Sequence, residues 1–108
     1  MDIEVTIFTI ITHSGEARSS SMEAIQNAKK GDYKKATKCM EDAKEKLALA
    51  HEAQTMLIHS EAQGNKVEIS LLMIHAQDHL MNAMTVKDLA EEFVDLYRNV
   101  MCRKQEVV

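Results

Sequence analysis

The segment Leu-Leu-Met-Ile-His-Ala-Gln-Asp-His-Leu-Met, residues 71–81, is apolar almost all the way around a helical wheel, yet it carries two histidines, a glutamine and an aspartate. An amphipathic helix keeps such polar groups on its solvent face. Here they lie between Leu, Met, Ile and Ala, so some must enter a packed site, where an unpaired polar group costs about 1–3 kcal/mol. The segment therefore predicts a helix whose polar side chains are paired, bind a metal or take part in chemistry.

The whole composition favours helices. The 108 residues include no proline and only three glycines, while Ala, Leu, Met, Glu, Lys and Gln are abundant. These residues are strong helix formers. Gly31 and Gly64 stand where a chain of three helices would turn. A chain of this length is enough for one domain and too short for two, so we expect residues 1–108 to form a single all-α domain, an antiparallel three-helix bundle.

Charge and cysteine usage exclude several classes of protein. The net charge is −4 and no basic block is present, which argues against a nucleic-acid surface. Asp2 and Glu4 are unlike the start of a signal peptide, and no apolar run approaches the roughly 20 residues of a membrane span. We therefore expect a cytoplasmic protein. Cys39 and Cys102 match no metal-binding spacing and are expected to be reduced thiols.

The first helix is expected from about residue 4 to residue 30, because apolar positions repeat there mostly at helical spacing. The start, Ile3-Glu4-Val5-Thr6-Ile7, alternates like a strand. No partner strand is evident elsewhere, so we interpret it as helix. Gly15 lies inside this helix, where glycine costs up to about 1 kcal/mol relative to alanine; it either allows a close approach or is simply tolerated.

The second helix has the clearest pattern. Gly31 is a suitable helix stop and Asp32 a suitable N-cap. Beyond them, residues at alternating steps of four and three form a seam for packing against other helices; they are Ala36, Met40, Ala43, Leu47, Ala50, Gln54 and Leu57. Gln54 is the polar member of this seam. It is expected to fix the packing register or to hydrogen-bond a histidine.

The third helix is expected from about residue 67 to residue 103. Its second half has an apolar seam of Leu89, Phe93, Leu96 and Val100. Its first half, residues 69–86, lacks a clear polar face, and a helix that is apolar all round is buried on all sides. One three-helix protomer cannot bury its own helix in this way. We therefore expect self-association, with this half near the axis of the oligomer.

The histidines of the third helix allow three interpretations. His75 and His79 lie four residues apart on one helical face, with Asp78 beside them. The set could bind a metal, form a buried hydrogen-bonded network, or include a catalytic histidine. His51-Glu52 begins like a zinc-protease motif, but Thr55 stands where its second histidine belongs. His51 and His59 are expected to be exposed, and the eight methionines to be mostly core filler.

The chain resembles the IIA component of the bacterial sugar phosphotransferase system, in its lactose/cellobiose class. The resemblance spans nearly the whole chain in the expected order. It rests on four segments: Ser14-Gly15-Glu16-Ala17-Arg18-Ser19, Gly31-Asp32-Tyr33, Ala50-His51-Glu52-Ala53-Gln54-Thr55, and Ile74-His75-Ala76-Gln77-Asp78-His79-Leu80-Met81. The last of these is the specific signal.

This resemblance implies a three-helix bundle assembled as a homotrimer. It also implies that His75 takes a phosphoryl group from the phosphocarrier protein HPr and passes it to a cysteine of the IIB component. The IIC membrane permease would then import and phosphorylate a β-disaccharide such as cellobiose, chitobiose or lactose. His79 would orient or hydrogen-bond the reacting group. Asp78 would meet its symmetry copies around a divalent metal, Mg²⁺ by family assignment.

Two other functions remain open from the residues themselves. One is a metal-binding bundle that uses His75, Asp78 and His79, and the other is a structural interaction bundle without phosphotransfer. The phosphoryl carrier alone predicts a labelled histidine when HPr, enzyme I and phosphoenolpyruvate are supplied.

Overall fold

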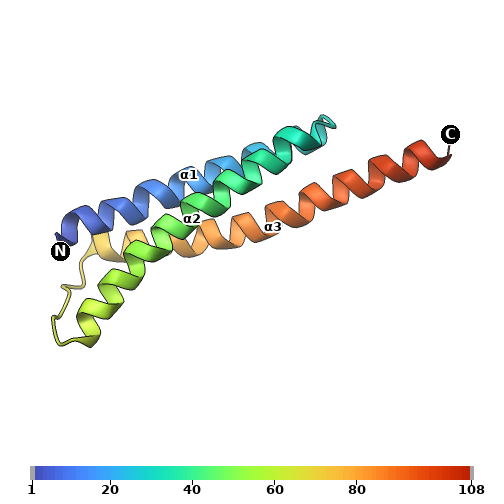
Figure 1. Cartoon of the computed structure of the whole chain (residues 1–108). Helices are drawn as coiled ribbons and strands as arrows, with labels where there is room; N and C mark the ends of the chain where they lie inside the picture. The colour runs from blue at the N-terminus through green and yellow to red at the C-terminus, as the bar shows by residue number, and fades with distance from the viewer. Residues whose placement is uncertain (1, 108) are drawn as a thin grey trace.

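The computed structural model describes the backbone of residues 2–107 and the side chains of residues 2–101. Three long helices follow one another: α1 (Ile3–Lys29), α2 (Tyr33–Ala62) and α3 (Leu71–Val107). α1 and α3 run in the same direction, and α2 runs against both (Figure 1). The molecule is elongated, 64 × 20 × 18 Å. The expected all-α bundle of three helices is confirmed.

Local capping explains where the first two helices begin. The Asp2 carboxylate accepts the Val5 backbone N–H at 3.2 Å, so the strand-like residues that follow enter α1 directly. Asp32 caps α2 in the same way by accepting from the Lys35 N–H at 3.1 Å. Gly31 turns the chain between them with φ +80°, a left-handed conformation that glycine adopts without steric cost.

The start of α3 corrects the sequence prediction. The helix was expected from about residue 67, but it begins at Leu71. The physical reason is local: Gly64 has φ +96°, and the Ser70 hydroxyl accepts the Met73 N–H at 3.1 Å as an N-cap. Serine is a preferred capping residue because its oxygen satisfies an N–H that the first turn leaves free. Residues 65–70 form the extended connection before it.

Small side chains hold α1 against both of its neighbours. α1 packs most closely on α2, next on α3, while α2 and α3 touch little. Alanines bring the helix axes close together, and Ile10 and Leu80 fill the centre with no exposed surface. The seam expected on α2 is confirmed, since its apolar members are buried. The core has two parts, one beside the start of α3 and one toward the 30–32 turn.

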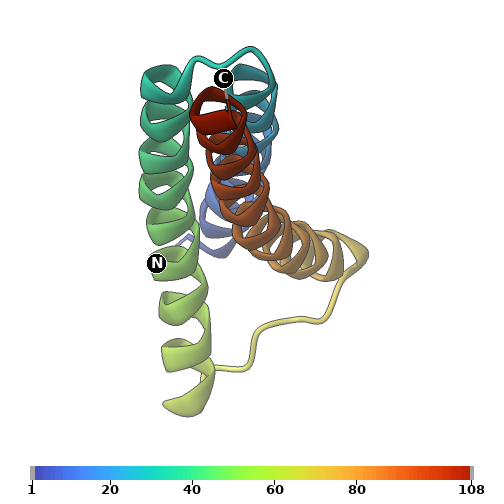
Figure 2. The ribbon, with the colours of Figure 1, turned by 90° about the vertical axis from the view of Figure 1, so that its right-hand side faces the viewer.

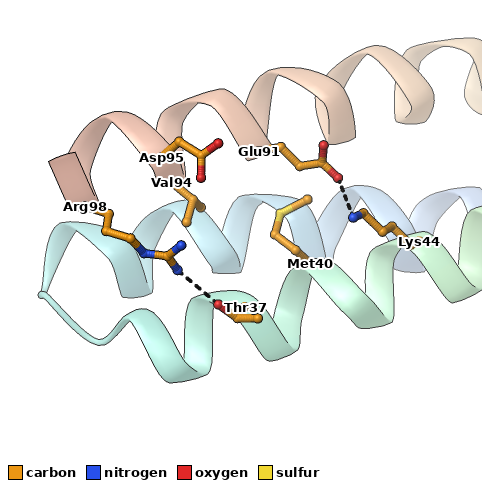
Figure 3. Close-up of a pocket in the computed structure, with 7 residues that line it drawn as sticks. All are labelled: Thr37, Met40, Lys44, Glu91, Val94, Asp95 and Arg98. Carbon is orange, nitrogen blue, oxygen red and sulfur yellow. Dashed lines mark hydrogen bonds and ion pairs between the residues drawn. The ribbon is translucent and has the colours of Figure 1, made fainter.

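Polar contacts join α2 and α3 where apolar contact is sparse. The C-terminal end of α2 diverges from α3 (Figure 2). Farther along, Lys44 Nζ lies 3.1 Å from Glu91 Oε1, and the Arg98 guanidinium donates to Thr37 Oγ1 at 3.1 Å. These pairs border a cavity between the two helices (Figure 3). These polar pairs connect α2 and α3 where the two helices bury few apolar side chains against each other.

Two expectations about apolar side chains are wrong within one protomer. The seam of α3 that was expected to pack inward is exposed: Leu89, Phe93, Leu96 and Val100 are between 41% and 56% accessible. Ala90 and Val94 face the core instead. Most of the described methionines are also at the surface, namely Met22, Met56, Met81, Met84 and Met101. A long apolar stripe of α3 is therefore left uncovered by the protomer's own helices.

In the part of the chain that the structure describes, no helix combines the length and apolar character needed to cross a membrane.

The same substitution at two glycines should have opposite effects. Gly31→Ala forces a side chain into a left-handed backbone and should lower the free energy of unfolding by about 1–2 kcal/mol. At Gly15, an added Cβ would meet only His79 Nε2 at 3.8 Å, an ordinary contact, so Gly15→Ala should raise stability by up to about 1 kcal/mol through helix propensity. Urea unfolding at one fixed protein concentration measures both. A destabilised Gly15→Ala variant would contradict the space described around His79.

Candidate functional site

The residues singled out by the sequence lie on successive turns near the start of α3. His75 and Asp78 are exposed, and His79 is half-buried. The ring centroids of His75 and His79 are 5.3 Å apart, with the planes tilted by 46°. Among the described residues, no three His, Cys, Asp or Glu side chains come close enough to bind a metal together. The motif thus presents an exposed imidazole beside a sheltered one.

Helix α1 forms the other side of this site. The Nε2 atom of His79 points at Gly15, where a Cβ would lie 3.8 Å away. An open hollow follows along the groove between α1 and α3, lined by Gly15, Arg18, Ser19, Met22 and His79. From the sequence, Gly15 is expected either to allow a close approach or to be tolerated, whereas Arg18 and Ser19 enter only through the family resemblance. Their place beside His79 depends on the register between two helices that are far apart in the chain.

A glutamine pair fixes how α3 is rotated. Gln54 Nε2 donates to Gln77 Oε1 at 2.6 Å across the α2–α3 interface, so Gln54 pairs with a glutamine and not with a histidine. Gln77 also lies 3.8 Å from Met73 Sδ. Because Gln77 faces α2, the histidines on either side of it in the sequence turn toward α1 and solvent. The pair therefore orients the site without being part of it.

The carboxylates between α1 and α2 are already paired. Glu16 Oε2 lies 3.3 Å from Lys46 Nζ and 3.6 Å from His13 Nδ1. The hydrogen bond with Glu16 and the charge of that carboxylate raise the pKa of Lys46 above its ordinary value. Asp42 accepts from the Ser20 hydroxyl at 2.5 Å. The acidic groups next to the site are thus directed toward α2, away from the groove that contains His79.

Asp78 lies within the exposed apolar stripe of α3. Leu71 is 83% accessible, and Ile74 and Met81 are each 55% accessible. With Asp78, these residues follow steps of three, four and three along the helix, which place them on one face. A single carboxylate thus stands in the middle of a surface that would otherwise be apolar.

The cavity of Figure 3 is separate from this site. It is lined by Thr37, Met40, Lys44, Glu91, Val94, Asp95 and Arg98, with no histidine or cysteine among them. The Arg98 guanidinium carbon also lies 5.5 Å from the centroid of the Tyr33 ring, a cation–π arrangement. The basic groups that border this cavity are used in holding α2, α3 and the first turn of α2 together.

The chain matches the family of lactose/cellobiose-specific IIA subunits of the sugar phosphotransferase system over residues 5–98. It is 57% identical to the lichenan-specific phosphotransferase enzyme IIA component of Bacillus subtilis, with 92% of this chain and 90% of that protein covered.

Two solved structures are also similar. The crystal structure of the cellobiose-specific enzyme IIA from Bacillus anthracis has a TM-score of 0.91 at 54% identity, covering 94% of each chain. The IIA(chitobiose)–HPr complex of the Escherichia coli phosphotransferase system has a TM-score of 0.81 at 35% identity, covering 94% of this chain and 98% of that one.

The fold and the sequence together thus define a class of protein, a helical carrier subunit with an exposed histidine. The chain belongs to the family of lactose/cellobiose-specific IIA components of the sugar phosphotransferase system.

Cys39 lies far from the histidines, in the core near the first turn. It is half-buried, and the Asn27 side-chain amide donates to its Sγ at 3.7 Å. Burial, followed by the nearby Glu23 carboxylate, raises the pKa of this thiol. Because the thiolate is the nucleophilic form, Cys39 is poorly suited to accept a phosphoryl group at neutral pH.

Alkylation can test this directly. In a Cys102→Ser background, Cys39 should react with iodoacetamide about tenfold more slowly at pH 7.5 than a free cysteine, since a raised pKa and burial both reduce the available thiolate. The rate should continue to rise as the pH is raised beyond 9. Mass spectrometry over time gives the rate, and reaction as fast as that of the free amino acid would contradict the described environment.

Proposed function

We propose that this protein carries a phosphoryl group on His75, between phospho-HPr and a cysteine of a IIB component. The observation that supports the proposal is the exposure of His75 on α3, within the motif on which the family resemblance rests. The E. coli relative was solved as a complex with HPr, which supports the same type of donor here. The B. subtilis and B. anthracis relatives, named for lichenan and cellobiose, support a β-linked disaccharide as the transported sugar.

The transfer requires a neutral imidazole and little else from His75. A ring nitrogen with a free lone pair attacks phosphorus, and the bond between phosphorus and the HPr atom that carries it breaks, so the electron pair returns to that atom. In the second step the IIB thiolate attacks, an S–P bond forms and the N–P bond to His75 breaks. Phosphoryl transfer depends mainly on positioning and charge stabilisation, and a long helix provides a rigid position.

His79 is proposed to orient the reacting group. Its ring centroid is 5.3 Å from that of His75, and its Nε2 lies beside Gly15. The half-buried ring is confined between α1 and α3, while the His75 ring is free to meet a partner. A ring N–H held in this position is able to donate a hydrogen bond to a phosphoryl oxygen.

We further propose that the protein works as a trimer joined through the exposed stripe of α3. Large contiguous apolar surfaces are rare on monomers and mark association sites. The stripe runs from Leu71 to Val100 on one face of the helix, and its members repeat at the three-four spacing of helix–helix interfaces. Association through it would bring the Asp78 residues of the three copies together.

The chemistry of Asp78 fits a shared divalent ion. One protomer offers a single carboxylate in an apolar stripe, and a buried unpaired charge is very costly. Three carboxylates would provide oxygen ligands of the kind that Mg²⁺ and Ca²⁺ prefer. The ion would neutralise their mutual repulsion and link the subunits. It has no assigned step in the phosphoryl transfer.

Labelling should identify His75 as the acceptor. With HPr, enzyme I and labelled phosphoenolpyruvate, wild type should gain an acid-labile, base-stable label, whereas His75→Ala should fold and gain none. His79→Ala should retain reduced labelling, with a rate lowered by about 10²-fold if its hydrogen bond stabilises the transferring group. His51→Ala is the matched control, because His51 is an exposed histidine on α2, and it should label like wild type. Full labelling of His75→Ala would overturn the proposal.

Sedimentation and thermal unfolding test the assembly. Wild type should sediment as three copies of the 12.2 kDa protomer, and a chelator should lower its melting temperature by ~5 °C, because an ion bound only to the native state stabilises it by mass action. Asp78→Leu should remain a trimer and lose the chelator effect, since buried ionic clusters often exchange with apolar groups at little cost.

Glu45→Leu is the control for this experiment. Its carboxylate is exposed on α2, on a different helix from the stripe, so the variant should respond to chelator as wild type does. A wild-type monomer at micromolar concentration would contradict the trimer. Wild-type melting that ignores chelator, in a protein purified without metal, would contradict the shared ion alone.

A further inference from the structure

The half of the protomer that contains the histidines has very few fixed positive charges. Arg18 is the one lysine or arginine in residues 1–28, and residues 47–65 and 71–86 contain none. A phosphoryl group carries negative charge on oxygens that must be stabilised during transfer. The positive charge for this purpose must come from α1, from the neighbouring lysines or from a partner protein.

The neighbouring lysines are directed elsewhere. Lys46 lies 3.3 Å from Glu16 and is engaged on the α1–α2 side. Lys66 belongs to the 65–70 connection, whose Val67 and Ile69 line a hollow with Met73 and Gln77. Gln77 is on the face of α3 that meets α2. The connection that contains Lys66 therefore meets α3 on the side opposite to the groove between α1 and α3.

Arg18 is placed in that groove. It lines the same open hollow as His79, together with Gly15 and Ser19. Glu16, the nearest acidic residue to it along α1, is already paired with Lys46 and His13. Arg18 and Ser19 thus both line the hollow on the histidine side of α1.

The Arg18 side chain leans along α1 in the direction that leads from His79 to His75 on α3. Arg18 is three residues beyond Gly15, about 4.5 Å farther along the axis at the usual helical rise. Side chains on a helix lean toward its N-terminus, so the long Arg18 side chain runs back toward the level of Gly15 and His79. Because α3 runs parallel to α1 (Figure 1), the same direction leads from His79 to His75.

We propose that Arg18, assisted by Ser19, binds the non-bridging oxygens of the phosphoryl group on His75. This rests on the proposed function of His75. Arginine suits the role because its planar guanidinium presents paired donors to phosphate oxygens and stays charged at all working pH values. The absence of a side chain at Gly15 leaves space beside the His79 ring, in the hollow that Arg18 and Ser19 also line. In this arrangement α1 provides the charge and α3 provides the nucleophile.

The test has two measurements on Arg18→Gln and on the control Lys66→Gln, which removes one positive charge from the 65–70 connection. First, the initial rate of phosphorylation by phospho-HPr should fall at least about tenfold in Arg18→Gln, as when a donor to a developing charge is removed. Lys66→Gln should stay near wild type, and Arg18→Lys should recover part of the rate.

The second measurement is a ³¹P NMR titration of the isolated phosphorylated protein, without HPr. A neighbouring cation favours the doubly charged phosphoryl group, so Arg18→Gln should raise the phosphoryl pKa by about half a unit, whereas Lys66→Gln should leave it unchanged. A slower rate with an unchanged phosphoryl pKa would mean that Arg18 only contacts the donor protein, and would overturn the proposal. An equal shift in the Lys66→Gln control would also overturn it. Failure of the proposed function is distinct: wild type would take up no label, or His75→Ala would label fully.

Discussion

Helix α3 has two apolar faces, and one protomer covers only one of them. The face with Ala76, Leu80 and Ala83 packs into the core, while the stripe with Leu71, Leu89 and Leu96 remains exposed. The hydrophobic effect acts on any apolar surface in water, so burial of the second face against another surface would lower the free energy. The position of His75 follows from this division, because it lies on the border between the covered face and the uncovered one.

Much of the fold could be predicted from local chemistry. Asp2 and Asp32 cap the helices that follow them, and Gly31 has the positive φ that a glycine stop implies. The seam of α2 was predictable because its charged side leaves one face for packing. Ser70 was missed as the cap of α3, because Val67 and Ile69 extend the apolar pattern of α3 to positions before the residue where the helix begins.

The inward face of α3 could not be predicted in the same way. Leu89 and Phe93 are larger and more apolar than Ala90, so pattern alone assigns them to the core. Within the protomer the small residue is buried, because α1 approaches closely and its own contact residues, Ala24 and Ala28, are small. The candidate site, too, could be predicted only in part from the sequence. The motif identifies His75, Asp78 and His79, whereas the meeting of Arg18 with His79 depends on the register of two helices separated by the whole of α2.

The order of the helices has a consequence for biosynthesis. Synthesis proceeds from the N-terminus, so α1 and α2 leave the ribosome before α3 and are free to form their extensive shared interface first. Contacts between elements joined by a short turn also form fastest, because little loop entropy is lost. The hairpin of α1 and α2 is thus a template on which α3 docks last. When α3 docks, the site with His75 and His79, the parallel groove and the uncovered stripe all form in a single final event.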